Sequence, residues 1–299
     1  MTPIAEKDND ASVWAIVLTH GGAEAITAEC IDSLLTQDYP GLAVLLVDNA
    51  AFDGSGGRLR DRYPQIRYLN TGGNYGYTGG NNRGIAYSLE QGADFLLVLN
   101  NDTVLERDCM SLLVQSARGA ERVGAVAPKI LCWDDPSRIW FAGGDYSFPR
   151  AIGQHRRMLE VDDPNEAPRL DEITFVSGCC FLMPAGVARE VGGFREDFFI
   201  YCEDVELSLR LTRAGYRMYY QPAARMLHRE NSGGALSTPF ATVQRDRNRR
   251  RLVRQHYNFW QRLVFALWFY PTRVVRWAQH ALRGDWPGAR AIVAGAVLP

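Results

Sequence analysis

The stretch Asp94-Phe-Leu-Leu-Val-Leu-Asn-Asn-Asp102 joins the strongest strand pattern of the chain to a polar tripeptide. Five consecutive apolar residues with polar residues on either side are typical of a short strand buried on both faces. Similar apolar runs come earlier, at residues 14–19 and 43–48, and apolar residues at helical spacing occupy residues 28–35 and 80–90. Strands that alternate with helices predict an α/β fold, here a mixed, mainly parallel sheet with helices on both faces.

The pattern weakens in the middle of the chain. Residues 129–170 are rich in Pro, Gly and charge, so we expect irregular structure there, leading to a strand at residues 173–176. Helical spacing returns at residues 205–211. The run from residue 216 to residue 228 contains a proline and predicts short strands or loops.

Polar residues directly follow three of the predicted strands, as Thr19-His20, Asp48-Asn49 and Asn100-Asn101-Asp102. Ligands of α/β sheets bind at the carboxyl ends of the strands, so we expect these side chains to border one site. A carboxylate such as Asp48 can accept a hydrogen bond from a pyrimidine N–H or a ribose hydroxyl, and Asp102 can hold a divalent ion that also contacts phosphates. Each carboxylate could instead cap a helix or stabilise a turn.

A stretch rich in glycine and asparagine, residues 74–84, precedes the helix predicted at residues 80–90. Glycines allow a ligand to approach the backbone closely, and a helix N-terminus favours anions such as a pyrophosphate. Clusters of this kind also form ordinary turns. The stretch matches neither the dinucleotide-binding fingerprint nor the phosphate-binding loop of nucleotide triphosphatases, which argues against both of those classes.

Three acids follow an aromatic run in the sequence Phe198-Phe-Ile-Tyr-Cys-Glu-Asp-Val-Glu206. Asp204 could act as a general base that takes a proton from a hydroxyl group. The acids could instead complement the dipole at the N-terminus of a helix. His228 stands alone, and a lone histidine is more typical of a structural or surface residue than of a ligand.

Taken in order, these motifs resemble the family 2 glycosyltransferases of the GT-A fold, and in particular their rhamnosyltransferase-like branch. The resemblance extends over about residues 14–232. The motifs that carry it are residues 17–20, 33–40, 47–50, 74–84, 99–103, 191–194 and 201–206.

The resemblance implies a set of residues that bind the nucleotide-sugar donor. Thr19 and Asp48 would contact the nucleoside, and His20 stands where many members have Tyr, which changes the stacking against the base. Asn82 and Arg83 would lie near the base or the phosphates. Asn100, Asn101 and Asp102 would complete the donor site.

The resemblance also implies a metal ion and a catalytic base. Asp102 matches the second Asp of the D-x-D motif of the family and would bind Mg²⁺ or Mn²⁺ together with His228. Asn100 replaces the first Asp of that motif, which leaves one negative charge fewer for the ion. Asp204, in the pair that it forms with Glu203, would be the base.

The implied function is inverting transfer of a sugar to a glycan or lipid-linked acceptor in the synthesis of a cell-surface polysaccharide, a hexosyltransferase type of reaction. L-rhamnose from dTDP-rhamnose is the first candidate donor. Alternatives are UDP-galactofuranose, UDP-glucose or an amino sugar on the same fold. A domain that binds carbohydrate without catalysis is the alternative outside the enzymes, and the acids, which a binding module does not need, argue against it.

Composition limits the class of protein. Hydrophobic residues make up 46% of the 299 residues and charged residues 22%, as in ordinary globular proteins. The six cysteines form no C-x-x-C pair, so we expect reduced thiols and a cytoplasmic protein without a zinc finger. Residues 1–11 are polar and predict a disordered N-terminus rather than a signal peptide.

The charge is concentrated at the C-terminus. From Phe240 onward the chain has eleven Arg and two acids, a net +9, against −10 in the preceding residues. We therefore divide the chain into a catalytic domain at residues 12–237 and a basic, amphipathic helical tail at residues 238–299, helical from residue 244. Its longest apolar run, residues 263–270, is too short to span a bilayer.

Arg interleaved with Trp and Leu predicts an anionic membrane surface as the partner of this tail, at the inner face of the cell membrane. Arg249, Arg250, Arg251 and Arg254 are the residues expected to face it. The tail could instead pack on the catalytic domain or form a homo-oligomer interface. Nothing else in the chain favours a nucleic acid as the partner.

Overall fold

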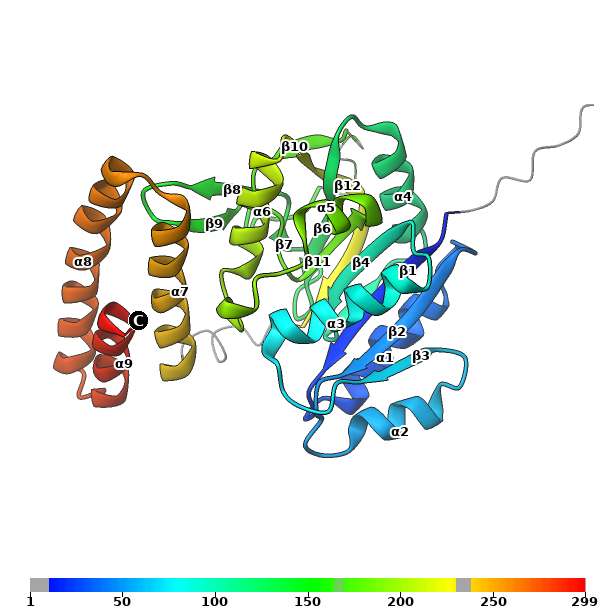
Figure 1. Cartoon of the computed structure of the whole chain (residues 1–299), viewed down its shortest axis with the longest axis horizontal. Coiled ribbons are helices and arrows are strands. Elements are labelled where there is room, and N and C mark those ends of the chain that lie inside the picture. The colour runs from blue at the N-terminus through cyan, green and yellow to red at the C-terminus, as the bar shows by residue number, and fades with distance from the viewer. Residues whose placement is uncertain (1–10, 164, 166, 168, 230–237, 299) are drawn as a thin grey trace, which may run out of the picture.

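A computed structural model of the chain describes residues 11–163, 165, 167, 169–229 and 238–298. Strands and helices alternate through its first half (Figure 1). In chain order they are β1 (Val13–Thr19), α1 (Glu24–Leu35), β2 (Leu42–Asp48), α2 (Ser55–Arg62), β3 (Arg67–Asn70), α3 (Gly76–Glu90), β4 (Phe95–Asn100), β5 (Thr103–Leu105) and α4 (Cys109–Gly119). The α3 helix begins four residues before the prediction because its Gly- and Asn-rich first turn has no apolar period.

The second half holds more strands than the sequence predicted. It comprises β6 (Val123–Cys132), β7 (Ile139–Phe141), β8 (Gly144–Ser147), β9 (Ile152–His155), β10 (Asp171–Ile173), β11 (Cys180–Pro184), α5 (Ala185–Val191), a 3₁₀ helix η1 (Glu196–Phe198), α6 (Glu203–Arg213) and β12 (Arg217–His228). The prediction of irregular structure at residues 129–170 was therefore wrong in part, and the strand predicted at residues 173–176 ends at Ile173. The run from residue 217 to residue 228 is one strand, whose register shifts between Gln221 and Arg225, next to its proline.

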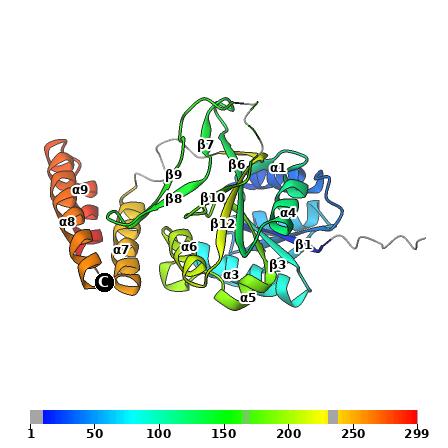
Figure 2. The ribbon, with the colours of Figure 1, turned by 90° about the horizontal axis from the view of Figure 1, so that it is seen from above.

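The main sheet runs β10-β12-β6-β11-β4-β1-β2-β3, with β5 beside β12 and β7 beside β6. Along the main path only β10 and β11 oppose the common strand direction. Figure 2 shows α1 and α4 on one side of the sheet and α3 and α5 on the other. The predicted mixed, mainly parallel sheet with helices on both faces is confirmed.

The order of the strands fixes where a ligand can bind. The chain moves from β1 outward through β2 and β3 and then returns to β4 on the other side of β1. Such a reversal opens a crevice at the carboxyl ends of the strands. Thr19 pairs there with Asp48, and Leu18 pairs with Asn100. The polar residues after the three strands therefore share one edge of the sheet, as the sequence predicted.

Three helices form the tail: α7 (Pro239–His256), α8 (Phe259–Leu282) and α9 (Trp286–Val297). The α9 helix packs against both α7 and α8, and α7 lies between them and the sheet domain (Figure 1). The Thr238 side chain caps α7, which starts five residues before residue 244. Among the described helices, none is long and apolar enough to cross a membrane. The predicted boundary at residue 237 and the predicted disorder of residues 1–10 lie outside the described residues.

The prediction that Arg249, Arg250 and Arg251 face a membrane was wrong. The Arg249 guanidinium is buried and donates to the carbonyl of Arg150, and Arg250 donates to the carbonyls of Gly295 and Leu298. Arg251 donates to the carbonyl of Asp197. Consecutive residues of a helix point about 100° apart, so three adjacent arginines cannot share one outward face.

Candidate active site

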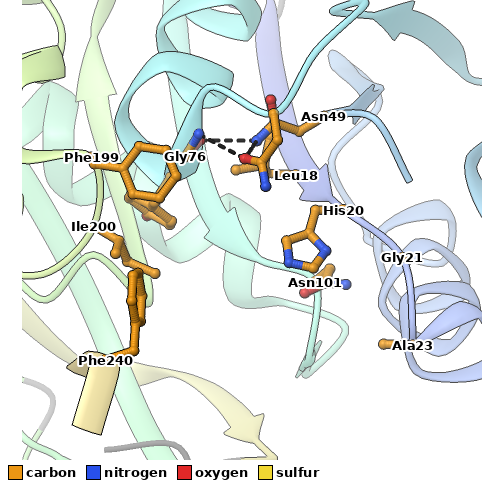
Figure 3. A pocket seen from close by; sticks show the side chains of 12 residues that line it. Leu18, His20, Gly21, Ala23, Asn49, Gly76, Asn101, Phe199, Ile200 and Phe240 are labelled. Atoms are coloured by element: carbon orange, nitrogen blue, oxygen red, sulfur yellow. Dashed lines mark hydrogen bonds between the residues drawn. The ribbon is translucent and has the colours of Figure 1, made fainter. Parts of the chain in front are cut away.

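A cavity of about 420 Å³ opens at the carboxyl ends of β1, β2 and β4 (Figure 3). Figure 3 shows His20 and Asn101 on one side of it and Phe199, Ile200 and Phe240 on the other. The lining residues are Leu18, His20, Gly21, Ala23, Asn49, Asn74, Gly76, Tyr77, Asn101, Phe199, Ile200 and Phe240. Its position is the one expected for the nucleotide part of a donor.

Asn49 shapes the wall of this first cavity. Its amide nitrogen donates to the Gly76 carbonyl at 3.0 Å and to Oδ1 of Asn74 at 3.2 Å, and its Oδ1 accepts from the backbone N–H of Tyr75 at 3.1 Å. Gly76 has φ +69°, and a Cβ there would lie 2.4 Å from the Phe199 ring. A side chain at residue 76 would therefore separate α3 from the segment that carries Phe199.

Asp48 is buried beside the first cavity without lining it. Its carboxylate accepts hydrogen bonds from the Tyr68 hydroxyl at 2.7 Å, from the Asn70 amide at 3.3 Å and from the backbone N–H of Ala51 at 2.7 Å. Thr19 is also buried and does not line the cavity. The predicted nucleoside contacts of these two residues stay predictions.

Asn82 and Arg83 lie on α3 and line neither this cavity nor the second cavity described below. The Asn82 amide donates to the Phe194 carbonyl at 2.7 Å and accepts from the Phe194 N–H at 2.7 Å, so it joins α3 to the segment before η1. The Arg83 guanidinium stacks 3.4 Å from the centre of the Tyr75 ring and donates to the Gly79 carbonyl. Within the described structure, both side chains interact with protein groups.

A second cavity of about 310 Å³ adjoins the first, and Tyr77 and Ile200 line both. Its other lining residues are Asn100, Trp140, His155, Met158, Ser177, Gly178, Cys179, Tyr201, Glu203, Asp204 and His228. Asn100 thus borders the second cavity and Asn101 the first. Two adjoining cavities with the predicted base and metal ligands beside the second can hold a donor and an acceptor together.

Glu203 and Asp204 are the first two residues of α6, where Asp204 faces the second cavity. Oδ2 of Asp204 accepts from the Gly178 N–H at 3.1 Å, and Oδ1 accepts from the Val205 N–H at 2.8 Å. Burial raises the pKa of Asp204, while these hydrogen bonds oppose the rise. Burial, and then the charge of Asp204, raises the pKa of Glu203 well above its usual value.

Asp102 and His228 meet at the edge of the second cavity. His228 Nε2 lies 3.2 Å from Asp102 Oδ1. Two adjacent ligands that sit about 2.1 Å from one octahedral ion are about 3 Å apart, so the pair fits a shared divalent cation. Asp102 Oδ1 and His228 Nδ1 are buried atoms that form no hydrogen bond within the described part of the chain.

The described residues contain no group of three or more His, Cys, Asp or Glu side chains that could hold a metal ion. An ion at Asp102 and His228 would therefore need further ligands of another kind, such as the oxygens of a diphosphate. Mg²⁺ commonly takes one or two carboxylates together with substrate phosphates. The residues present fit an ion that binds with a diphosphate.

The sequence analysis missed part of the second cavity. Trp140 of β7 packs edge-on against the rings of His155 and His228, with ring centres 4.5 and 4.6 Å away. Trp140 and His155 come from the segment predicted to be irregular, and only long-range pairing brings them to the site. Asn49 directly follows a predicted strand, and Tyr77 lies in the Gly- and Asn-rich stretch. These positions were the signal from which both residues could have been assigned to the site.

The sequence is similar to those of known proteins. The model of the family described as glycosyltransferase like family 2 matches residues 13–257. The N-acetylglucosaminyl-diphospho-decaprenol L-rhamnosyltransferase of Mycobacterium tuberculosis (strain H37Rv) is 33% identical over 209 residues, which are 62% of this chain and 66% of that protein. Rhamnosyltransferase WbbL of Escherichia coli (strain K12) is 27% identical over 57% of this chain and 67% of its own length. The chain thus matches only part of each relative.

Solved structures share the fold. GalNAc-T7 with UDP, GalNAc and Mn²⁺ superposes with a TM-score of 0.64 at 13% identity, over 83% of this chain and 48% of that one. The mannosyltransferase PcManGT of Pyrobaculum calidifontis, in complex with GDP-Man and Mn²⁺, gives a TM-score of 0.59 at 18% identity. The match covers 97% of this chain and 81% of that one. These likenesses confirm the predicted GT-A fold. The family match extends across both cavities and through α7, and the chain belongs to glycosyltransferase like family 2.

Proposed function

We propose that the chain is an inverting glycosyltransferase that moves L-rhamnose from dTDP-rhamnose to a lipid-linked acceptor. The observation that carries this proposal is the arrangement of the second cavity. Asp204, the proposed base, faces it beside Glu203, and the Asp102–His228 pair lies at its edge. The first cavity, beside Asp48 and at the N-terminus of α3, would receive the nucleotide.

The proposed chemistry is a direct displacement with Asp204 as the base and no covalent intermediate with the protein. Asp204 takes the proton of the acceptor hydroxyl while that oxygen attacks the anomeric carbon, and the bond from this carbon to the nucleotide diphosphate breaks. A single displacement inverts the anomeric carbon, as it does in inverting hydrolases. Glu203 lies beside Asp204 and lines the same cavity, and burial raises its pKa well above the usual value.

Asp102 and His228 would hold Mg²⁺ or Mn²⁺, which supplies positive charge to the leaving diphosphate when it is bound. Asn100 adds a neutral amide beside them where a second carboxylate would strengthen binding of the ion. The structural neighbours that contain Mn²⁺ support this proposal through their shared fold.

The names of the relatives support the choice of substrates. The mycobacterial relative acts on N-acetylglucosaminyl-diphospho-decaprenol, and both relatives quoted above are rhamnosyltransferases. UDP-galactofuranose, UDP-glucose and an amino-sugar donor remain the alternatives on the same fold. A non-catalytic carbohydrate-binding domain would not need a buried Glu203–Asp204 pair, because burying acids is costly without a function.

A transfer assay with a panel of nucleotide sugars tests this proposal. The acceptor is a short-chain prenyl-diphospho-N-acetylglucosamine, and MgCl₂ or MnCl₂ is present. We expect dTDP-L-rhamnose to yield a product whose mass increases by one deoxyhexose, with little product from UDP-galactofuranose or UDP-glucose. Transfer from another donor would correct the sugar, whereas no transfer from any donor, by a protein that binds the donor, would favour the non-catalytic alternative.

We further propose that residues 12–237 form the catalytic unit and that the tail holds it at the inner face of the cell membrane. Trp260, Leu267 and Val274 are 70%, 69% and 65% exposed, on the face of α8 opposite its buried residues. Their spacing of seven residues places them on one stripe of the helix. Arg254, Arg262, Arg276 and Arg290 are exposed on the three helices of the tail, and Arg283 is exposed just after α8. Apolar side chains flanked by arginine suit an anionic membrane interface.

A triple variant, Trp260→Ser with Leu267→Ser and Val274→Ser, should no longer bind anionic vesicles. Wild type should sediment with vesicles that contain phosphatidylglycerol and less with neutral phosphatidylcholine, and rising salt should weaken binding because it screens the arginines. The triple variant should lose binding yet turn over the short-chain acceptor normally. Val161→Ser, an exposed apolar residue outside the tail, is the control that keeps binding. Equal sedimentation with both vesicle types would contradict the proposal and favour a homo-oligomer interface.

A further inference from the structure

The segment between η1 and α6 adopts a strained backbone. Phe199, Tyr201 and Cys202 have φ values of 59°, 70° and 65°, and they are three of the eight non-glycine residues with positive φ in the described chain. Such residues persist only where their surroundings hold them, and they cluster at functional sites. Cys202 is the N-cap residue of α6, directly before Glu203 and Asp204. The strained turn therefore determines where α6, the helix that carries Asp204, begins.

Asn248 of α7 holds this turn. Its amide nitrogen donates to the carbonyls of Phe198 at 2.7 Å, Ile200 at 2.9 Å and Tyr201 at 2.8 Å. The Asn248 side chain is fully buried, at 0% exposure, and its Oδ1 accepts from Nη1 of Arg251 at 3.2 Å. One amide group thus gathers three carbonyls along the turn. Buried carbonyls that lost this donor would have to find another partner or move.

The other side of the turn is held by the donor-site helix. The Phe199 carbonyl accepts from the backbone N–H of Thr78 in α3 at 3.1 Å, and the Phe199 ring lies over Gly76. Ile200, whose carbonyl accepts from Asn248, lines both cavities. The turn is therefore fixed between α3 and α7, and only the α7 side depends on Asn248.

We propose that Asn248 is a positioning residue for the transfer reaction, which sets the place of Asp204 through the Phe198–Tyr201 carbonyls. The inference rests on the proposed role of Asp204 as the base. It also gives the tail a part in the active site, which Phe240 of α7 shares by lining the first cavity. A purely structural role, in which Asn248 only attaches the tail, would lower stability without a specific effect on turnover.

Two variants separate these roles. Asn248→Asp keeps the shape of the side chain but removes its N–H donor. Asn248→Ala removes the donor and the shape of the side chain together. Ile292→Ala is the matched control, because Ile292 is 1% exposed in α9 and its loss should loosen the tail away from the turn. Transfer is measured with dTDP-L-rhamnose, MgCl₂ and the short-chain prenyl-diphospho-N-acetylglucosamine. Donor affinity is measured by calorimetry, and the melting temperature of each variant is recorded.

We expect both Asn248 variants to lower kcat about 100-fold while donor Kd changes less than about threefold, because small misplacements of a catalytic group are costly and the α3 contacts are intact. Hydrogen exchange should speed up in peptides that cover residues 196–206. Ile292→Ala should lose melting temperature without either effect. The Asp204→Asn variant should lower the rate of transfer by about 10²–10⁴ in the same assay.

Two results would overturn the inference alone: kcat near the wild-type value in both folded Asn248 variants, or an equal loss of kcat in Ile292→Ala at equal loss of melting temperature. In either case Asp204→Asn would still lose transfer, and the proposed function would stand. Transfer that survives in Asp204→Asn would overturn the proposed base, and the positioning role would fail with it.

Discussion

Replacing Asp204 with asparagine should lower the rate of sugar transfer by about 10²–10⁴ while donor binding persists, because the variant loses a general base and keeps the shape of the side chain. Asparagine can still accept from the Gly178 and Val205 N–H groups that hold the carboxylate. Transfer is measured as kcat with dTDP-L-rhamnose and the short-chain acceptor, and donor binding by calorimetry. Turnover within a few-fold of wild type would show that another group takes the proton.

The pH dependence of this reaction carries the same test. Asp204 acts only when it is deprotonated, and burial raises its pKa. kcat/KM should therefore reach its full value above that raised pKa and fall as the pH drops through it. This fall should come at a higher pH than it would for an ordinary carboxyl group. Glu203→Gln is the neighbouring control. Its rate should fall far less than that of Asp204→Asn, and the fall at low pH should remain, since burial is the main cause of the raised pKa.

Removing either proposed metal ligand should weaken the binding of divalent ions by the enzyme. Asp102→Ala and His228→Ala should each lower the affinity for Mn²⁺ in the presence of dTDP, measured by electron paramagnetic resonance, and EDTA should abolish transfer by the wild type. The reason is geometric: Asp102 Oδ1 and His228 Nε2 lie 3.2 Å apart, as two ligands of one ion do. Asp108→Asn, an exposed acid of the same segment, is the control and should behave as wild type.

Full activity in EDTA would contradict this assignment. The chain would then work without a metal ion, which the neutral amide of Asn100 in place of a carboxylate makes chemically reasonable. Unchanged Mn²⁺ affinity in both variants would place the ion elsewhere.

The central strands could be predicted because they are buried on both faces. The runs of β1, β2 and β4 are almost wholly apolar, which is a local signal, and it placed Thr19, Asp48 and Asn100 at one edge of the sheet. The strands β7, β8 and β9 have three or four residues each and no clear alternation. They exist through pairing with partners elsewhere in the fold, so Trp140 and His155 could not be assigned to the site from sequence.

In the tail, the sequence did not reveal which polar side chains face the protein. A polar side chain in an arginine-rich helix has the same pattern whether it faces water or protein. Asn248, Arg249 and Arg251 all face the protein, which only their tertiary contacts reveal. Asn82 is a similar case, since its motif predicts a ligand contact and its amide bonds the backbone of Phe194.

The anomeric configuration of the product tests the central claim most directly. Wild-type protein is incubated with dTDP-L-rhamnose, MgCl₂ and the short-chain acceptor, and the new glycosidic linkage is read by nuclear magnetic resonance from the coupling between C1 and its hydrogen. A single displacement assisted by Asp204 predicts a linkage whose configuration is opposite to that of the donor. A product with the configuration of the donor would require a different mechanism and would contradict the account.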